Sequence, residues 1–262
     1  MKIGLIGAGN MGIFLLEKIN KCGFLPNYSI VSVLDEREKA KNSMPALSEQ
    51  YGFAFFSHLN AFLTSGIDLV VESSNIQAVH TYAERILREK DLLVISVGAL
   101  ADQLVYKRLL STAERSGTRL YLPAGAIGGL DAIKAAGITG DLNSVSLISR
   151  KPGKALVNGE LTEEKVLFSG SASEAIARFP QNANVAITLS LAGIGTDKTK
   201  VTIIADPTLE TNVHTVQASG SFGKMEFTLQ NRPSPDNPKT SHLTALSILS
   251  RLQSLKEQTV IG

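Results

Sequence analysis

Short apolar runs alternate with helix-like stretches along the first 122 residues. The runs occupy residues 2–6, 30–34, 53–56, 68–72, 92–96 and 119–122, and the stretches with helical spacing occupy residues 13–19, 59–63, 76–88 and 102–115. Continuous apolar runs are typical of strands that are buried on both faces of a parallel sheet. Strands that alternate with helices predict a doubly wound α/β sheet with right-handed crossovers.

After residue 129 the pattern changes to period-2 alternation with tighter turns, which favours a mixed or antiparallel sheet. The expected strands are 145–149, 166–168, 200–205, 213–218 and 224–229, and the expected helices are 130–136, 175–179, 185–191 and 240–256. Ser171 and Glu174 form a capping-box pattern, and residues 182–184 resemble a cap for the next helix. We therefore predict a second, smaller α+β domain.

We place the first domain at residues 1–123 together with the C-terminal helix, residues 239–262, which we expect to pack back on it. The second domain, residues 124–238, is expected to bind the substrate and to carry any dimer contact.

A glycine motif follows the first apolar run and precedes the first helix. It reads Gly7-Ala8-Gly9-Asn10-Met11-Gly12. Its first glycine allows a tight turn, its second lets a pyrophosphate approach the backbone, and its third lets the helix lie close to the strand. Together with the amides at the helix start, the motif predicts a Rossmann-type dinucleotide site that includes Asn10 and Met11.

The second apolar run ends at Asp35, where a carboxylate can accept hydrogen bonds from the adenosine ribose of NAD. Arg37 lies two residues further on and could instead bind the 2′-phosphate of NADP. The sequence therefore predicts NAD or NADP and leaves the choice open.

Ligands of doubly wound sheets lie beyond the carboxyl ends of the strands. Small residues occupy these ends here, and we expect them to approach the ribose and nicotinamide. They are Ser73, Ser74, Ser96, Ala99 and Ala126.

Among the four histidines, His214 follows a polar turn between two strands of the second domain and is a candidate for proton transfer near pH 7. An anion site is expected at Asn237-Pro238-Lys239-Thr240-Ser241, read as a helix start with Asn237 as N-cap and Pro238 at the first helical position. Lys239, Thr240 and Ser241 would then hold a substrate carboxylate.

The composition argues against several other classes. The formal net charge of +2 offers no basic stripe for nucleic acid. Glycines, Asn10, Glu17 and Lys18 interrupt the apolar N-terminus, so we expect no signal peptide or membrane span. The single cysteine, Cys22, is consistent with a reducing cytoplasm, and the scattered histidines give little support to a metal site. Acyl transfer lacks a Gly-x-Ser-x-Gly elbow.

Four stretches carry a resemblance to a known family. They are residues 123–131 (PAGAIGGLD), 179–186 (FPQNANVA), 205–214 (ADPTLETNVH) and 237–241 (NPKTS). In this order and at this spacing, the chain resembles the L-aspartate dehydrogenase family over nearly its whole length. The resemblance places the family's catalytic histidine on His214 and its cofactor-contacting alanine and asparagine on Ala126 and Asn184.

The resemblance implies NAD(P)-dependent oxidative deamination of L-aspartate to iminosuccinate. That product hydrolyses to oxaloacetate and ammonia or supplies quinolinate synthesis toward NAD. We expect aspartate to lie between the two domains, with His214 accepting the ammonium proton as hydride leaves. A cytoplasmic homodimer is expected.

Two alternatives stay open at this point. One is another imine reductase of related architecture, similar to dihydrodipicolinate reductase. The other is a protein that binds dinucleotide as a regulatory ligand without turnover.

Overall fold

The computed structural model describes residues 1–157, 159–180, 184–234 and 237–259. The chain forms two compact units, Met1–Pro123 and Ala124–Gly262. The last helix falls within the second of these units. Our expectation that it packs on the first domain stays a prediction.

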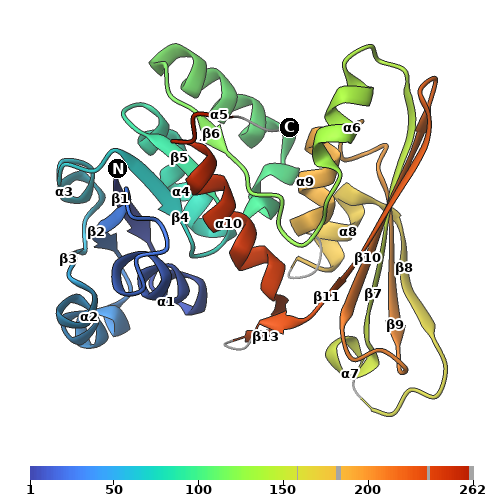
Figure 1. Cartoon of the computed structure of the whole chain (residues 1–262), viewed down its shortest axis with the longest axis horizontal. Helices are drawn as coiled ribbons and strands as arrows, with labels where there is room; N and C mark the ends of the chain where they lie inside the picture. The colour runs from blue at the N-terminus through green and yellow to red at the C-terminus, as the bar shows by residue number, and fades with distance from the viewer. Residues whose placement is uncertain (158, 181–183, 235–236, 260–262) are drawn as a thin grey trace. The chain divides into compact units, whose positions relative to one another are not determined.

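The first unit contains a six-stranded sheet in the order β3-β2-β1-β4-β5-β6 (Figure 1). Its strands are β1 (Lys2–Ile6), β2 (Ser29–Leu34), β3 (Ala54–Phe56), β4 (Leu69–Glu72), β5 (Asp91–Val94) and β6 (Leu120–Tyr121). Every neighbouring pair is parallel. The order reverses between β1 and β4, which confirms the doubly wound Rossmann-type sheet.

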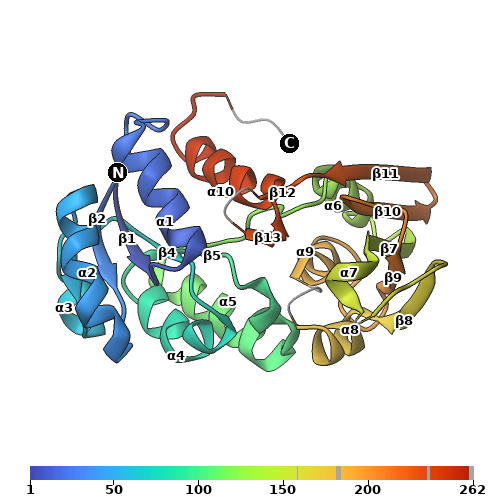
Figure 2. The ribbon, with the colours of Figure 1, turned by 90° about the horizontal axis from the view of Figure 1, so that it is seen from below.

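Helices connect these strands on both faces of the sheet. They are α1 (Asn10–Leu16) with the π-helical turn η1 (Glu17–Lys21), α2 (Glu38–Tyr51), α3 (Leu59–Leu63), α4 (Ile76–Leu87), the 3₁₀ turn η2 (Val97–Ala101) and α5 (Gln103–Ser116). Figure 2 shows α1 on one side of the sheet and α4 with α5 on the other. Asn75 and Asp102 cap α4 and α5 by accepting hydrogen bonds from backbone amides in the first turn.

The second unit contains a mixed five-stranded sheet in the order β11-β10-β7-β9-β8. Its strands are β7 (Leu142–Pro152), β8 (Lys165–Ser171), β9 (Lys200–Asp206), β10 (Asn212–Gly220) and β11 (Gly223–Asn231). Only β7 and β9 pair in parallel, and the other neighbours are antiparallel. The predicted mixed sheet is therefore confirmed.

One face of this sheet is covered by helices, as Figure 1 shows. The helices are α6 (Leu130–Gly137), α8 (Ala172–Arg178) and α9 (Asn184–Ala192), and a short helix, α7 (Gly153–Leu156), follows β7. Alternate residues of β7 and β10 are buried, as expected for strands with one covered face. The predicted capping box of Ser171 and Glu174 is present at the start of α8. Of the expected cap of α9, residues 182–183 lie outside the described residues.

The predicted start of the last helix is wrong. Residues Asn237–Ser241 form a strand, β13, that pairs with β12 (Pro233–Ser234), and the helix α10 (His242–Ser254) begins after it with Ser241 at the N-cap. The His242 amide donates to the Arg232 carbonyl at 2.9 Å. Strand pairing thus satisfies backbone groups of this proline-rich segment, which the sequence predicts to form a first helical turn.

No helix among the described residues has the length and apolar character needed to cross a membrane.

Candidate active site

The glycine turn at the end of β1 is built as its sequence predicts. Gly7 has φ +84°, a conformation that side chains rarely adopt, and its amide donates to the Leu34 carbonyl at 2.9 Å. A Cβ on Gly12 would lie 2.3 Å from the Gly7 carbonyl oxygen, so α1 can lie this close to the turn only with glycine there. The first and third glycines therefore have the structural roles that the motif predicts.

The middle glycine faces open space. A Cβ built on Gly9 would meet no atom within 4 Å, and Gly9 and Asn10 are exposed. Gly9 is the N-cap of α1 and offers no side-chain cap, and the first turn of α1 holds no acidic residue. The amides at this helix start can therefore receive an anion, which fits the pyrophosphate of a dinucleotide.

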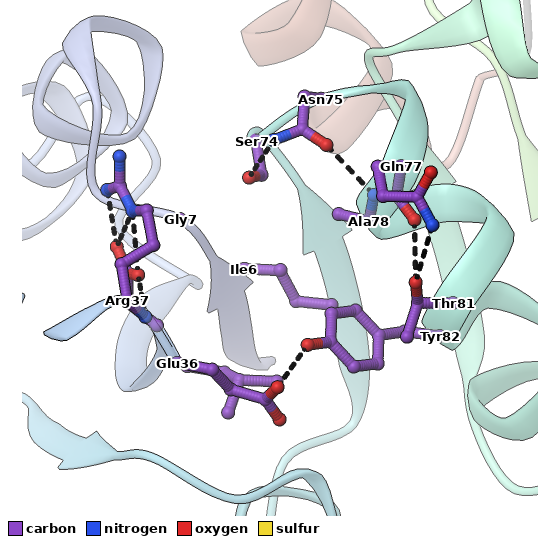
Figure 3. Close-up of a pocket in the computed structure, with 12 residues that line it drawn as sticks. Ile6, Gly7, Glu36, Arg37, Ser74, Asn75, Gln77, Ala78, Thr81 and Tyr82 are labelled. Atoms are coloured by element: carbon purple, nitrogen blue, oxygen red, sulfur yellow. Dashed lines mark hydrogen bonds and ion pairs between the residues drawn. The ribbon is translucent and has the colours of Figure 1, made fainter.

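A pocket of about 290 Å³ opens beside this turn (Figure 3). It lies at the carboxyl ends of β1 and β2 and along the start of α4. Its lining comprises Ile6, Gly7, Leu34, Asp35, Glu36, Arg37, Ser74, Asn75, Gln77, Ala78, Thr81 and Tyr82. The position fits the adenosine end of a dinucleotide whose pyrophosphate meets the glycine turn.

Asp35 and Arg37 bind each other at the edge of this pocket. The guanidinium Nη2 donates to Asp35 Oδ2 at 2.6 Å, and Nε donates to Oδ1 at 2.9 Å. Burial alone would raise the Asp35 pKa, but the hydrogen bonds and charge of Arg37 outweigh it and lower the pKa below its usual value. Because the Asp35 side chain is buried and that of Arg37 is 66% exposed, the arginine is the partner that can turn away.

Tyr82 closes another side of the pocket, where its hydroxyl donates to Glu36 Oε2 at 2.5 Å. Burial and this bond to a carboxylate raise the pKa of Tyr82 to about 12, so the hydroxyl stays protonated. Glu36 is thereby held by Tyr82 in the arrangement of Figure 3.

The two predicted serines after β4 have different positions. Ser73 is buried, and its hydroxyl donates to the carbonyls of Ile6 and Gly7 at 3.0 and 2.8 Å. These two hydrogen bonds stabilise the glycine turn from the buried side. Ser74 is exposed and lines the pocket, with its side chain next to Gly7.

A buried carboxylate that the sequence reasoning missed joins the ends of β4 and β5. Glu72 Oε1 accepts from the Ser74 amide at 2.8 Å and from the Ser96 hydroxyl at 2.9 Å, while Oε2 accepts from the Ser96 amide at 2.9 Å. Burial raises the Glu72 pKa against these hydrogen bonds. Ser96 thus binds Glu72, and Ala99 lies buried in the adjacent turn η2.

His214 lies on β10 in the second unit and faces the helix-covered side of the sheet. It is 3% exposed, and its Nδ1 lies 3.1 Å from the hydroxyl oxygen of Ser149, the residue paired with it on β7. Burial and the charge of Lys151 lower the His214 pKa to about 4. The imidazole is therefore neutral at pH 7, which is the form that can accept a proton.

Lys151 follows Ser149 by two residues on β7 and is buried, with 8% of its surface exposed. Burial lowers its pKa to about 8, so the amine is mostly charged at pH 7. A cation and an imidazole thus lie near each other on the covered face of the sheet.

Further polar side chains are buried at the end of this sheet where His214 and Lys151 lie. Asn212 Nδ2 donates to Ser241 Oγ at 3.2 Å, and Asn231, its pairing partner on β11, donates from Nδ2 to the Ala126 carbonyl at 2.9 Å. These contacts link the loop of Ala126 to the strand that carries His214. Of the predicted site residues, Ser241 is therefore bonded to the strand that carries His214, and Ala126 is bonded to the neighbouring strand β11.

For the remaining predicted residues, the structure gives only the position in the fold and the exposure of some side chains. Asn184 is the half-exposed first residue of α9, next to Val185, whose Cγ1 would lie 3.2 Å from a Cβ built on Gly125. The loop before Ala126 therefore lies beside the start of α9. Thr240 is half-buried in β13, and the side chain of Lys239 lies outside the described part of the chain.

Two of the missed residues had a usable signal. Glu72 ends a strand that is predicted to be buried, so its carboxylate had to find donors there. Lys151 continues the inward positions of Val145, Leu147 and Ser149, but only if the strand runs past residue 149, where our prediction ended it. The contact between Asn231 and Ala126 joins residues too far apart in the chain for any local pattern to indicate.

Comparisons with known proteins agree with this arrangement. Residues 4–123 match the NAD-binding domain of homoserine dehydrogenase, and residues 131–255 match the C-terminal domain of aspartate dehydrogenase. The L-aspartate dehydrogenase of Methanosarcina barkeri is 40% identical over 274 residues, covering 100% of this chain and 99% of that protein. The L-aspartate dehydrogenase of Archaeoglobus fulgidus is 40% identical over the full length of both chains.

Solved structures also include a similar aspartate dehydrogenase. The crystal structure of aspartate dehydrogenase from Thermotoga maritima matches with a TM-score of 0.82 and 33% identity, covering 100% of this chain and 99% of that one. A myo-inositol dehydrogenase from Lactobacillus casei, solved with NAD(H) and myo-inositol, matches with a TM-score of 0.59 at 15% identity, over 97% of this chain and 84% of that one. The second likeness concerns the fold alone.

Proposed function

Because the chain belongs to the L-aspartate dehydrogenase family, we propose that it oxidises L-aspartate to iminosuccinate, with NAD or NADP as oxidant. The observation that carries the proposal is His214, a buried neutral imidazole on a strand that ends among buried polar side chains. The resemblance to the family implies a catalytic histidine at this position, which supports the proposal. Water would then convert iminosuccinate to oxaloacetate and ammonia.

The dinucleotide would be held by the first unit. Gly7, Gly9 and Gly12 shape the turn, the open start of α1 fits a pyrophosphate, and Asp35 lies where the adenosine ribose would be bound. When bound, the nicotinamide supplies the hydride acceptor. Asn10, Met11, Ser74, Ala99, Ala126 and Asn184 stay proposed cofactor contacts, whereas Ser73 acts by holding the turn.

His214 would accept the proton of the substrate ammonium group. In the tautomer in which Nδ1–H donates to Ser149 Oγ, the other ring nitrogen, Nε2, carries the lone pair that accepts the proton. Loss of this proton leaves an amine whose lone pair forms the C=N bond as the hydride departs from Cα. Ser149 would keep the ring in the productive orientation.

Lys239, Thr240 and Ser241 stay proposed contacts for a substrate carboxylate, although the helix start that suggested them is wrong. Ser241 is buried and accepts from Asn212, so its hydroxyl can take part while that bond holds it in place.

The test is a direct assay of the purified chain. L-aspartate with NAD or NADP should give reduced cofactor at 340 nm, and His214→Ala should lower turnover about 100-fold or more while NADH affinity changes little. His80→Ala, which removes an exposed histidine on α4, is the matched control and should retain turnover. A panel of other amino acids and cyclic imines serves as comparison.

The outcomes separate the alternatives. Turnover of a cyclic imine without turnover of aspartate would point to a different reductase, and NADH binding without turnover of any substrate would point to a regulator. An unchanged turnover number in His214→Ala would remove His214 from the mechanism.

We further propose a homodimer located in the cytoplasm. Among the residues that the structure describes, no helix covers the face of the second sheet opposite α6, α8 and α9 (Figure 1), and this face offers a surface for a second copy. The single cysteine, Cys22, fits a reducing compartment. A supply of iminosuccinate to quinolinate synthesis is a further proposal, testable by coupling the two reactions.

A further inference from the structure

Lys151 is a buried cation next to the proposed catalytic imidazole. It lies on β7, two residues beyond Ser149, so that both side chains project from the same face of the strand. Ser149 is paired with His214, which projects from the same face of β10. Three polar side chains are thus packed side by side under the helices of the second unit.

Lys151 is buried and mostly charged at pH 7, so its charge acts on nearby groups with little screening by water. The adjacent residue Arg150 projects from the opposite face, where it forms ion pairs with Glu164 and Asp206. The charge of Lys151 acts on His214, on the covered face. A substrate with two carboxylates that reaches His214 therefore meets a positive charge on the same face.

We propose that Lys151 binds one carboxylate of the substrate beside His214. This inference rests on the proposed function and adds a residue that selects a diacid. Neither the glycine motif nor the stretches that resemble the family include Lys151. Its role would be to bind and orient the substrate, not to transfer the proton.

The same placement links substrate binding to the strength of the base. The charge of Lys151 is one of the two causes that lower the His214 pKa, after burial. A carboxylate bound to Lys151 would cancel that charge and make the imidazole more basic. His214 would then accept a proton more readily when a substrate is present.

The experiment measures binding and turnover separately. Succinate is a diacid of the same length as aspartate without the amino group, so it reports on carboxylate binding alone. Its affinity for the full chain saturated with NADH would be measured by calorimetry in the wild type, Lys151→Met, Lys151→Arg and Lys200→Met. Lys200 is an exposed lysine on β9 and serves as the matched control.

Lys151→Met should weaken succinate binding by about 10-fold or more, since it removes a charge-assisted hydrogen bond. Lys151→Arg should retain most of the affinity, and Lys200→Met should match the wild type. For aspartate, Lys151→Met should raise KM by about 10-fold or more with kcat within about 3-fold, as expected when uniform binding is lost. Methionine is apolar and similar in length, so the variant should fold, and circular dichroism with thermal unfolding checks this.

Succinate binding by folded Lys151→Met that equals the wild type would overturn the inference while the proposed function stands. A loss of kcat without a change in KM would also overturn it, because Lys151 would then act in the chemistry. A wild-type chain that fails to oxidise aspartate would refute the proposed function instead, and succinate binding would still report on the lysine.

Discussion

At the scale of single residues, the proposed chemistry depends on side chains whose environments change their protonation. His214 is buried with the Ser149 hydroxyl at its Nδ1, and Lys151 lies nearby with a pKa lowered to about 8. The strand alternation buries both, because each occupies a position that faces the helices. Position on a pleated strand therefore determines their charge state as much as residue type does.

His214 is predicted to stay neutral between pH 8 and pH 5 in the free protein. Its pKa of about 4, against 6.5 for an exposed imidazole, means that the folded state binds its proton only at lower pH. This residue's contribution to stability therefore falls as pH decreases through 6.5 toward 4. A proton NMR titration of the ring signal that disappears in His214→Asn would check this.

In the same titration, Lys151→Met should raise the pKa of His214 but keep it below the ordinary value, because burial remains the larger cause. A wild-type midpoint near 6.5 would contradict the buried, neutral imidazole.

Arg37 is predicted to determine how well NADP binds. Its guanidinium is mostly exposed while bound to Asp35, so it can turn to a 2′-phosphate, whereas NAD needs only the buried carboxylate. Arg37→Ala should weaken NADP binding by about 10-fold or more and NAD binding by less than about 3-fold, measured by calorimetry. Arg115→Ala, an exposed arginine on α5, is the control, and equal losses for both cofactors would count against the idea.

At the scale of elements, one carboxylate joins the loops that follow β4 and β5 by hydrogen bonds. Glu72 accepts hydrogen bonds from Ser74 and Ser96 in the two loops that follow these strands, and no neutral side chain of the same shape can accept all of them. The spacing of the loops at the dinucleotide site is thus set from inside the sheet.

Glu72→Gln should lower the free energy of unfolding by about 1–3 kcal/mol at pH 7, because its amide group would face a backbone N–H. Chemical denaturation measures the change, and Glu114→Gln on the exposed side of α5 should stay within about 0.5 kcal/mol of the wild type. Since burial raises the Glu72 pKa, the folded state keeps this proton to a higher pH than the unfolded chain does. The contribution of Glu72 to stability therefore falls as the pH rises from the ordinary glutamate pKa to the raised one, and the variant should lose this pH dependence of stability. An unchanged denaturation curve would show that the loops do not need the carboxylate.

Elements also show where local patterns suffice. The buried runs of β1, β2 and β4 and the capping box of Ser171 and Glu174 were predictable, because the residues that determine them are neighbours in the chain. The start of α10 was not, because β12 and β13 pair with each other and delay the helix to His242. A proline before a lysine and two hydroxyl residues fits both a helix start and a strand.

At the scale of the whole molecule, the uncovered face of the second sheet bears on the proposed dimer. Thr215 and Thr228 face each other across β10 and β11 there, with their hydroxyls 3.1 Å apart, and the next pair of this face joins Gln217 to Glu226. These side chains already bind one another in pairs, which lowers the number of polar groups that a second copy would have to satisfy.

The wild type is predicted to sediment as a dimer, at twice its chain mass of 28.0 kDa. Thr228→Arg places a charge on this face and should shift the protein toward the monomer, because the charge would have to be desolvated in the interface. Glu114→Arg, which changes an exposed residue of the first unit, should leave the dimer intact. A monomeric wild type at about 100 µM in sedimentation equilibrium would contradict the dimer.

The linear chain was enough to identify the Rossmann-type unit, its glycine turn, the mixed sheet and the family, because these depend on periodicity and on residues close together in sequence. Folding decided what surrounds each side chain. Ser149 reaches His214 across 65 positions, Asn231 reaches Ala126 across 105, and Lys151 becomes a buried cation only because β7 continues past residue 149. Burial and charge act through space, so the state of the imidazole could be known only when distant strands had been paired.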